Sequence, residues 1–393
     1  MENKTQSVDR ITKVTFLSFT DLRLGAGTER VILNLISNYP SENIEVQIIE
    51  TDYYDKIRIS NEDISKMIPT AKIVKIKSID TKFKFLRSNV ITSFLYSTLL
   101  KPLGAIFQSQ EFKKVAGLIK DSDIVYLTRN SDIRYLVRFR GLVIGSSHTM
   151  SRLENLLATR GLLYKRINYY HFLSQPKLRE TKCSRNIKYF VIPNGVDSHK
   201  FSPIYKGKIE RIRFLYTGRL EKYKGIGILV KAWTKISDLD GIELHIVGGG
   251  AYERKLNKLN LSTILYHGVL SDTEVQKIFS ESDIFVYPTK RDIYPLVVLE
   301  ALSSGLFVIT SETLRGVLDD FSRIGALKYV KNSPGGILNE IYLSCRNIQE
   351  INDVRSQVHE YISSNYDWRI ISNKFFDKIL QLYYELNGEW RLH

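Results

Sequence analysis

The feature that most constrains this chain is the alternation of short apolar segments with amphipathic ones along almost its whole length. The apolar segments are rich in Val, Ile, Leu and Tyr, which is typical of strands buried on both faces of a parallel sheet. The segments between them place apolar residues at helical spacing, as Val31, Ile32, Leu35 and Ile36 do. The alternation therefore predicts an α/β protein with parallel sheets.

The predicted strands form two series, separated by the turn residues Pro193-Asn194-Gly195 and a polar run that continues to Gly207. Each series opens with a strand, a glycine-bearing loop and a helix, so we expect two Rossmann-like domains that face each other across a cleft. The domains are predicted at residues 1–200 and 201–370. The predicted strands are 14–19, 45–49, 72–76, 123–127, 142–145 and 188–192, then 213–217, 243–247, 264–268, 284–288 and 307–310.

Composition excludes several classes of protein. A chain of 393 residues with 43% hydrophobic and 25% charged residues is neither disordered nor collagen-like. Two cysteines, Cys183 and Cys345, supply neither a disulfide framework nor a four-cysteine zinc site, so we expect reduced thiols and a cytoplasmic location. Neither a leader peptide nor a membrane-spanning stretch is evident in the sequence.

Most of the net charge of +15 comes from one segment. Residues 81–189 contain 20 basic and 6 acidic side chains. Such a surface attracts nucleic acid, anionic lipid head groups or phosphorylated substrates, although a merely solvated face has the same composition. Within it, residues 89–107 are apolar and aromatic with basic flanks, which fits either a helix lying on a membrane surface or a core helix.

The strongest local signal is the segment 217–225, Thr-Gly-Arg-Leu-Glu-Lys-Tyr-Lys-Gly, between a predicted strand and a predicted helix. Gly218 permits a sharp turn, and the N-terminus of the following helix favours an anion. Arg219 and Lys224 add two cations beside that anion site. The segment therefore predicts a site for a diphosphate.

Two further elements follow in the second series. The predicted strand 243–247 ends in Gly248-Gly249-Gly250, where a ligand can approach the backbone closely. Asp292 and Glu300 then stand eight residues apart, one in a loop and one in the opening turns of an apolar helix. A carboxylate within such a face needs polar partners, and sugar or ribose hydroxyls are suitable ones. Asp121-Ser122-Asp123 precedes its strand, and we do not interpret it as a metal site.

Together these segments resemble the retaining, nucleotide-sugar-dependent glycosyltransferases of the GT-B fold, the group 1 family with an E-x7-E motif. The resemblance covers most of the chain and is most specific from Val191 to Ile309. The final helix, over 371–393, is implied to cross back onto the first domain. The segments that carry the resemblance are Ala26-Gly27-Thr28-Glu29-Arg30-Val31, Ile192-Pro193-Asn194-Gly195-Val196-Asp197, Gly218-Arg219-Leu220 with Lys224-Gly225, Val247-Gly248-Gly249-Gly250 and Asp367-Trp368.

The resemblance implies a role for each matching residue. Arg219 and Lys224 would neutralise the donor diphosphate as it departs, without a metal or another cofactor. Asp292 would contact the donor sugar, and His148 would lie near the sugar and the acceptor. Glu300 would bind the ribose. The remaining implied donor-binding residues are Gly27, Gly218, Gly248, Gly250, Tyr294, Leu296 and Val297.

This chain departs from the family pattern at three positions. Asp292 replaces a glutamate, Ala26 replaces the first glycine of its loop, and Pro295 stands where a glycine is usual. We predict an enzyme that transfers a hexose from a nucleotide sugar to a glycan or a lipid-linked acceptor, in peripheral contact with an anionic membrane. The alternatives are a basic nucleic-acid-binding protein, although nucleic acid is not the expected partner, and a nucleotide-sugar-binding protein without turnover.

Overall fold

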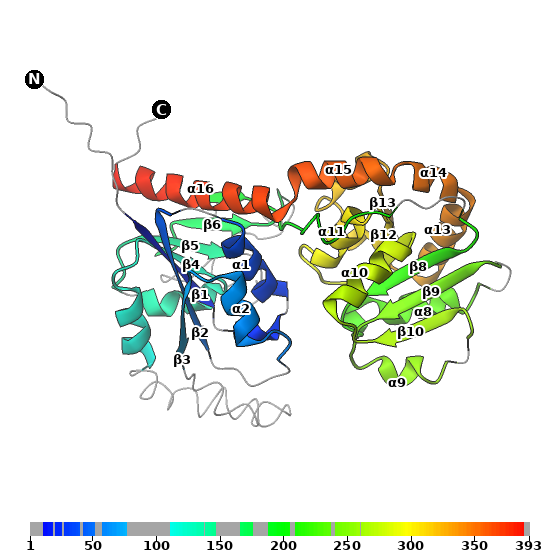
Figure 1. The fold of residues 1–393 in the computed structure, drawn as a ribbon, viewed down its shortest axis with the longest axis horizontal. Helices are drawn as coiled ribbons and strands as arrows, with labels where there is room; N and C mark the ends of the chain where they lie inside the picture. Colours follow the sequence, from blue (N-terminus) through cyan, green and yellow to red (C-terminus); the bar gives the residue numbers. More distant parts are fainter. Residues whose placement is uncertain are drawn as a thin grey trace, which may run out of the picture. The chain divides into compact units, whose positions relative to one another are not determined.

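The computed structural model describes residues 11–18, 20–25, 27–39, 42–51, 57–76, 111–136, 138–146, 166–175, 188–204, 209–236, 240–259 and 261–388. The chain forms two compact units. Unit 1 comprises Met1–Leu173, Lys177–Ile192 and Ser372–His393, and unit 2 comprises Ser174–Pro176 and Pro193–Ile371. Both units are α/β, which confirms the predicted fold class (Figure 1).

Unit 1 contains a seven-stranded parallel sheet in the order β3-β2-β1-β4-β5-β6-β7. The order reverses between β1 and β4, because the chain returns to the centre of the sheet after β3. Its strands are β1 (Thr12–Ser18), β2 (Ile44–Thr51), β3 (Lys72–Ile76), β4 (Ile124–Leu127), β5 (Leu142–Ser146), β6 (Tyr169–Phe172) and β7 (Tyr189–Val191). Its helices include η1 (Leu22–Leu24), α1 (Gly27–Ser37), α2 (Asn61–Met67) and η4 (Asn130–Leu136).

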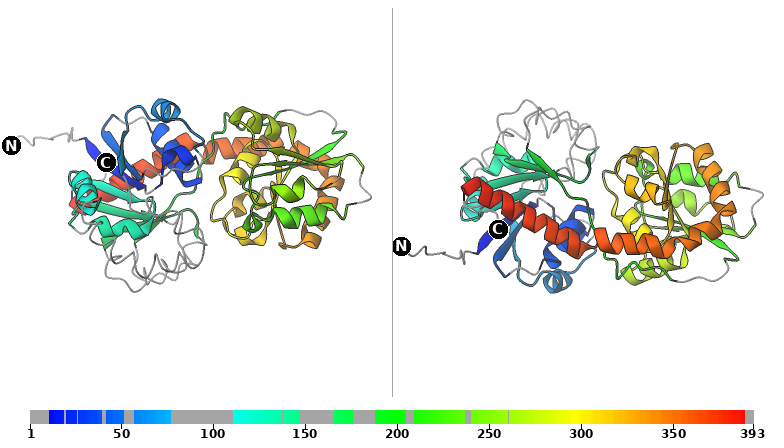
Figure 2. Two further views of the ribbon diagram at one scale, coloured as in Figure 1. Left: turned by 90° about the horizontal axis from the view of Figure 1, so that it is seen from below. Right: turned by 90° about the horizontal axis from the view of Figure 1, so that it is seen from above.

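The last helix, α16 (Trp368–Asn387), covers the sheet of unit 1 with its residues from Ser372 onward (Figures 1 and 2). Phe375 is edge-on to Tyr126 of β4, with ring centroids 5.3 Å apart. Phe376 packs edge-on against Phe16 of β1 at 6.2 Å. The Tyr383 hydroxyl donates to Asp123 Oδ1 at 2.7 Å. The predicted contact of the C-terminal helix with the N-terminal sheet is therefore confirmed.

Unit 2 contains a six-stranded parallel sheet in the order β10-β9-β8-β11-β12-β13, with helices on both faces (Figure 2). This is the doubly wound order in which ligands bind at the carboxyl ends of the strands, beside the point of reversal. The strands are β8 (Ile212–Thr217), β9 (Ile242–Val247), β10 (Ile264–Gly268), β11 (Ile284–Tyr287), β12 (Phe307–Ser311) and β13 (Leu327–Val330). The helices are η6 (Lys222–Lys224), α8 (Ile226–Trp233), α9 (Glu253–Leu256), α10 (Asp272–Glu281), α11 (Leu296–Ser303), η7 (Glu312–Leu314), α12 (Asp319–Arg323), α13 (Pro334–Arg346), α14 (Ile348–Asp353) and α15 (Arg355–Asn365).

The strands that flank the point of reversal in unit 2 are buried along their length, as their apolar sequences predict. Phe214 and Leu215 of β8 and Phe285 and Val286 of β11 have no exposed side-chain area. Because these strands are held rigidly in the core, the loops at their carboxyl ends start from fixed positions. Sequence reasoning missed only two of the strands in the described ranges, β6 and β13.

Candidate functional site

The candidate site lies in unit 2, at the carboxyl ends of β8 and β11, where the strand order reverses. Lys224 ends the short helix η6 after β8, and Asp292 lies in the loop after β11. The Lys224 Nζ and Asp292 Oδ1 atoms are 2.6 Å apart. The two side chains are 14% and 17% exposed, so the ion pair is largely shielded from solvent. The fold thus brings together two predicted site residues that are distant in sequence.

One ammonium group and two hydroxyl groups donate to the Asp292 carboxylate. Besides Lys224, the Tyr287 hydroxyl donates to Oδ2 at 2.8 Å and the Thr289 hydroxyl donates to the same oxygen at 2.7 Å. The Tyr287 oxygen also accepts from Lys224 Nζ at 2.9 Å. Burial, together with the neighbouring charge of Asp292, raises the pKa of Tyr287 well above its usual value. Tyr287 therefore remains a neutral hydrogen-bond donor at physiological pH.

Arg219 differs from Lys224 in that its side chain is exposed. Its guanidinium lies over the ring of Tyr223, with 5.5 Å between the guanidinium carbon and the ring centroid. The Lys224 ammonium lies 5.5 Å from the same centroid. Tyr223 therefore orients two cations through their attraction to its ring face. Among the described residues, no carboxylate forms an ion pair with Arg219, so its charge is available to an anion.

Glycines allow the loops of the site to touch each other. Gly248 has φ of +127°, and a Cβ atom there would lie 2.0 Å from the Gly218 carbonyl oxygen. Gly225 has φ of +83°, and its Cβ would lie 1.8 Å from the Pro288 carbonyl oxygen. Any side chain at these positions would push the loop after β8 away from its neighbours. Gly218 and Gly250 also have positive φ.

The second predicted carboxylate, Glu300, lies on α11 and is 8% exposed. Pro295 precedes this helix as its N-cap, and no side chain caps it. Leu296 and Val297 are half-buried in its first turn, where backbone N–H groups lack the usual helical acceptors. The start of α11 can therefore bind polar groups of a ligand through its backbone.

Tyr294 is buried and does not join the network around Asp292. Its carbonyl oxygen accepts from Asn194 Nδ2 at 3.1 Å. Its hydroxyl hydrogen-bonds to Tyr366, and burial, together with the neighbouring Tyr366 and Asp320 side chains, raises the pKa of Tyr294 well above the usual value. We therefore assign the side chain of Tyr294 to the packing of unit 2.

In unit 1, Gly27 is the exposed first residue of α1, and a Cβ built on it would meet nothing within 4 Å. The loop before it is held by Glu50, which accepts from the Leu22 amide at 2.8 Å. Burial raises the pKa of Glu50. His148 lies outside the described residues, as do Ala26, Cys183 and the segment 89–107.

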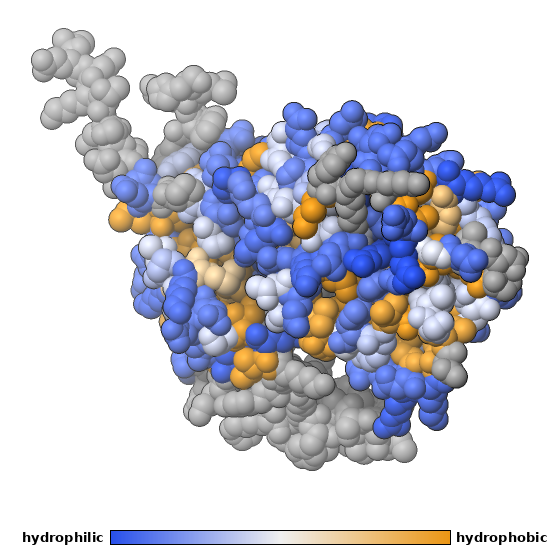
Figure 3. Space-filling view, turned by 45° about the vertical axis from the view of Figure 1, so that its right-hand side comes forward, coloured by the Kyte–Doolittle hydropathy of each residue, from blue (hydrophilic) through white to orange (hydrophobic). Residues whose placement is uncertain are grey.

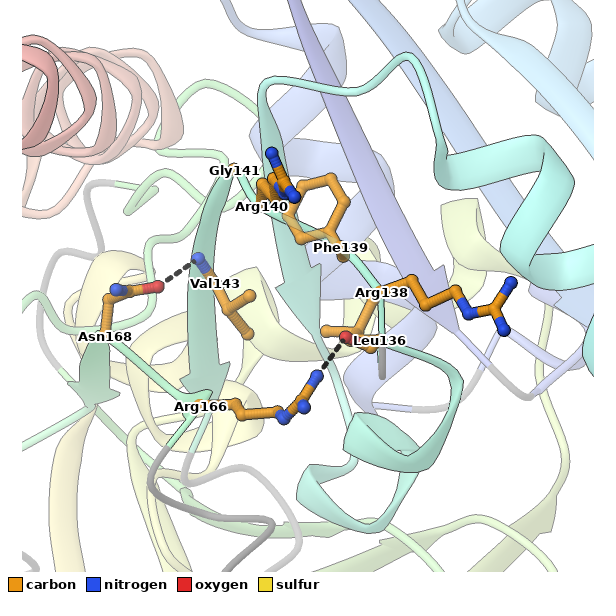
Figure 4. A pocket seen from close by; sticks show the side chains of 8 residues that line it. All are labelled: Leu136, Arg138, Phe139, Arg140, Gly141, Val143, Arg166 and Asn168. Carbon is orange, nitrogen blue, oxygen red and sulfur yellow. Dashed lines mark hydrogen bonds between the residues drawn. The ribbon is translucent and has the colours of Figure 1, made fainter.

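A separate depression of about 600 Å³ lies in unit 1 at the amino ends of β5 and β6 (Figure 4). Arg138, Arg140 and Arg166 contribute to its lining, and Arg166 Nη1 donates to the Leu136 carbonyl oxygen at 3.1 Å. The Arg138 side chain points away from Asn168 (Figure 4). This depression lies at the sheet edge opposite the strand ends that bind ligands in this type of fold.

Sequence reasoning missed three side chains of the candidate site: Tyr223, Tyr287 and Thr289. Tyr223 stands between the two predicted cations in the sequence. Tyr287 lies within the predicted strand 284–288, and Thr289 follows that strand directly. A rule that examines every polar residue at the ends of the two strands beside the reversal point would have found Tyr287 and Thr289.

Comparison with known proteins identifies the relationship of unit 2. Residues 211–332 match the family described as glycosyl transferases group 1. The chain is 26% identical over 197 residues to a sulfoquinovosyl transferase of Arabidopsis thaliana, covering 46% of this chain and 37% of the relative. It is 32% identical over 195 residues to an Escherichia coli UDP-Gal:alpha-D-GlcNAc-diphosphoundecaprenol alpha-1,3-galactosyltransferase, covering 41% of this chain and 49% of the relative. The chain thus spans less than half the length of either relative.

Solved structures resemble the chain over nearly all of its length. Sucrose-phosphate synthase from Thermosynechococcus elongatus has a TM-score of 0.72 at 16% identity, over 95% of this chain and 100% of its own. HepE from Anabaena, in complex with UDP and glucose, has a TM-score of 0.68 at 14% identity, over 94% and 99% of the two chains. These likenesses show the GT-B fold. The match of residues 211–332 to the family model confirms the resemblance to group 1 glycosyltransferases that was inferred from the motifs.

Proposed function

We propose that this chain is a retaining glycosyltransferase, which transfers a hexosyl group from a nucleoside diphosphate sugar to an acceptor hydroxyl. The observation that carries the proposal is the pair of cations after β8, Lys224 and Arg219, beside the start of α8. Neither α8 nor α11 has a side-chain cap, so their first backbone N–H groups can also serve an anion. A diphosphate with two to three negative charges matches this arrangement.

In the proposed reaction, the bond between the anomeric carbon and the diphosphate oxygen breaks while the acceptor oxygen bonds to that carbon. The acceptor proton passes to the departing diphosphate on the same face of the sugar, which retains the anomeric configuration. Lys224 and Arg219 stabilise the negative charge that develops on the leaving group. Glu300 would bind the ribose, and the amides of Leu296 and Val297 the donor.

The test uses Lys224→Ala with Lys222→Ala as the matched control, because Lys222 is an exposed cation in the same short helix. Purified protein is incubated with UDP- and GDP-hexoses, and the nucleoside diphosphate released with and without acceptor glycans is measured. We expect Lys224→Ala to lower kcat/KM by about 100-fold, as for loss of a charge-stabilising donor. Lys222→Ala should stay within about threefold of the native protein. Equal activity of the native protein and Lys224→Ala would refute the proposal.

The same purified protein can be used to identify the donor and to distinguish between the competing interpretations. UDP-sugars are tested first, because a similar structure contains UDP and glucose. A donor that raises the melting temperature without any nucleotide release would favour a binding protein without turnover. Salt-sensitive binding of single- or double-stranded nucleic acid, with no response to nucleotide sugars, would favour the nucleic-acid-binding alternative.

We further propose that the acceptor is carried on a lipid and that the protein binds peripherally to an anionic membrane at the cytoplasmic face. Support comes from the excess of basic residues over 81–189 and from the diphosphoundecaprenol acceptor named for the Escherichia coli relative. None of the helices in the described ranges has the length and hydropathy of a bilayer-spanning segment. On the face shown in Figure 3, hydrophobic residues occupy only small, separate areas among hydrophilic ones. The proposal therefore rests on the attraction of the basic residues of 81–189 to anionic head groups.

Sedimentation with liposomes tests the membrane contact. We expect binding to vesicles that contain anionic lipid at low salt, and release as the ionic strength rises, because screening weakens the attraction of Lys and Arg to the surface. Vesicles of zwitterionic lipid are the control. Absence of binding to anionic vesicles at low salt would exclude the peripheral contact without affecting the transferase proposal.

A further inference from the structure

The Asp292 carboxylate accepts three hydrogen bonds from protein side chains. Oδ1 accepts from Lys224 at 2.6 Å, while Oδ2 accepts from Tyr287 at 2.8 Å and from Thr289 at 2.7 Å. The shortest of these contacts is with the ammonium that we propose binds the diphosphate. This differs from the role implied by the family resemblance, in which the residue at this position contacts the donor sugar.

We propose that Asp292 is the resident counterion of Lys224. Its carboxylate competes with the diphosphate for the Lys224 ammonium and thereby promotes release of the nucleoside diphosphate product. The inference rests on the proposed function and adds a role for a residue of that site. Because Asp292 acts through Lys224 in this step, it is a positioning residue here and does not need to touch the reacting atoms.

The argument begins with charge. A diphosphate that contacts Lys224 must separate the ammonium from a carboxylate in a site that is largely shielded from solvent. It also places its own negative charges near that carboxylate, and like charges in a partly buried site repel each other more strongly than in water. Both effects weaken the binding of the nucleoside diphosphate.

The carboxylate stays in place when Lys224 is drawn away. Tyr287 and Thr289 hold Oδ2 from the end of β11 and the loop that follows it. Hydrogen bonds to an ionised carboxylate are strong, so these two hydroxyls keep the charge solvated and oriented during the exchange. The carboxylate can then recapture the ammonium as soon as the nucleotide moves. The arrangement is therefore reversible.

The test measures the binding of UDP and GDP to the native protein and to four variants by titration calorimetry, with dissociation followed by stopped flow. Asp292→Asn keeps the size of the side chain and removes its charge. We expect Asp292→Asn to lower the Kd of the bound nucleotide on the order of tenfold, mainly through slower dissociation. Asp292→Glu restores the charge and should return the Kd to within about threefold of the native value.

Glu221→Gln is the matched control for a general loss of negative charge, since Glu221 belongs to the same loop and, among the residues that the structure describes, Lys224 forms its ion pair with Asp292 and not with Glu221. The Kd of this variant should change by less than about threefold, as expected for a half-buried carboxylate outside the ion pair with Lys224. Asp292→Ala provides a second neutral variant, and circular dichroism confirms that each variant is folded. Asp292→Ala, like Asp292→Asn, should bind the nucleotide more tightly than the native protein does.

Weaker or unchanged nucleotide binding in both neutral variants would overturn the inference, because a purely structural or sugar-binding carboxylate gives that result. The proposed function would survive that outcome, since it depends on Lys224→Ala losing activity. Failure of the native protein to bind either UDP or GDP, together with inactivity toward their sugars, would overturn both. The two failures are therefore distinguishable.

Discussion

Protonation of His171 should destabilise unit 1 as the pH falls from neutrality toward 4. His171 lies on β6 and is 2% exposed. Its Nε2 is 2.8 Å from the Ile192 carbonyl oxygen, so Nε2 carries the proton and donates. Its Nδ1 is 2.8 Å from the Tyr126 hydroxyl and must accept from it. A second proton on Nδ1 would remove that acceptor and place a charge in the core.

The size of the effect follows from the pKa. Burial lowers the pKa of His171 to about 4, against 6.5 for an ordinary histidine. Below pH 6.5 the unfolded chain therefore binds a proton that the folded unit does not bind until about pH 4. The free energy of unfolding consequently decreases as the pH is lowered through this window. Linkage gives a loss of about 2 kcal/mol between pH 7.5 and pH 5 from this one group. The contribution is nearly constant above about pH 7.5, where the histidine is neutral in both the folded and the unfolded chain.

Hydrogen exchange measured by mass spectrometry on peptides from β4 and β6 is the suitable assay, because it reports on unit 1 directly, whereas Trp233 and Trp368 lie in unit 2. The comparison variant is His171→Gln, which cannot titrate in this range. We expect the variant to be less stable at pH 7.5 but to lose about 2 kcal/mol less than the native protein on going to pH 5. Parallel pH profiles for the two proteins would refute the reasoning.

Three further outcomes are expected. Gly248→Ala should destabilise unit 2 by about 3 kcal/mol or more, because φ is +127° and the new Cβ would lie 2.0 Å from a backbone oxygen; denaturation followed by tryptophan fluorescence measures this, and an unchanged midpoint would contradict it. Hydrogen bonds from Ser198 and Arg369 outweigh burial and lower the pKa of Asp367, so the stability that its carboxylate contributes above pH 3.8 is lost as the pH falls below that value. Asp367→Asn should lower the free energy of unfolding by about 2 kcal/mol near neutrality and should flatten the acid side of the plot of unfolding free energy against pH. Burial raises the pKa of Cys345 to about 11, so at pH 8 iodoacetamide should alkylate it about 100-fold more slowly than an ordinary cysteine, and rapid labelling of the folded protein would disprove this.

Much of the fold was predictable because apolar strands of a parallel sheet carry a strong sequence signal. The predicted strand at 72–76 is β3, and that at 264–268 is β10. The two missed strands have weaker patterns: β6 reads Tyr-Tyr-His-Phe and β13 reads Leu-Lys-Tyr-Val. Each contains a polar residue in a very short run. His171 is accommodated in β6 only because Tyr126 and Ile192 supply partners that the local sequence does not show.

The candidate site was predictable as a set of residue types and positions, while its internal contacts were not. Glycines and cations after β8 could be identified because each is locally tied to a turn or a helix start. The ion pair between Lys224 and Asp292 depends on the adjacency of β8 and β11, which are not consecutive in the chain. A sequence pattern gives the ends of both strands but not which groups will pair there. Side-chain partnership is a tertiary property.

The division of the first unit into separate stretches of sequence affects how the protein is made. Residues that cover Phe16 and Tyr126 belong to α16, which a ribosome synthesises after all of unit 2. The aromatic side chains of the unit 1 sheet therefore remain uncovered while unit 2 is translated, and unit 2 can fold before unit 1 is complete. Nascent chains stalled before Ser372 should consequently recruit chaperones through the first sheet, although that sheet emerged first.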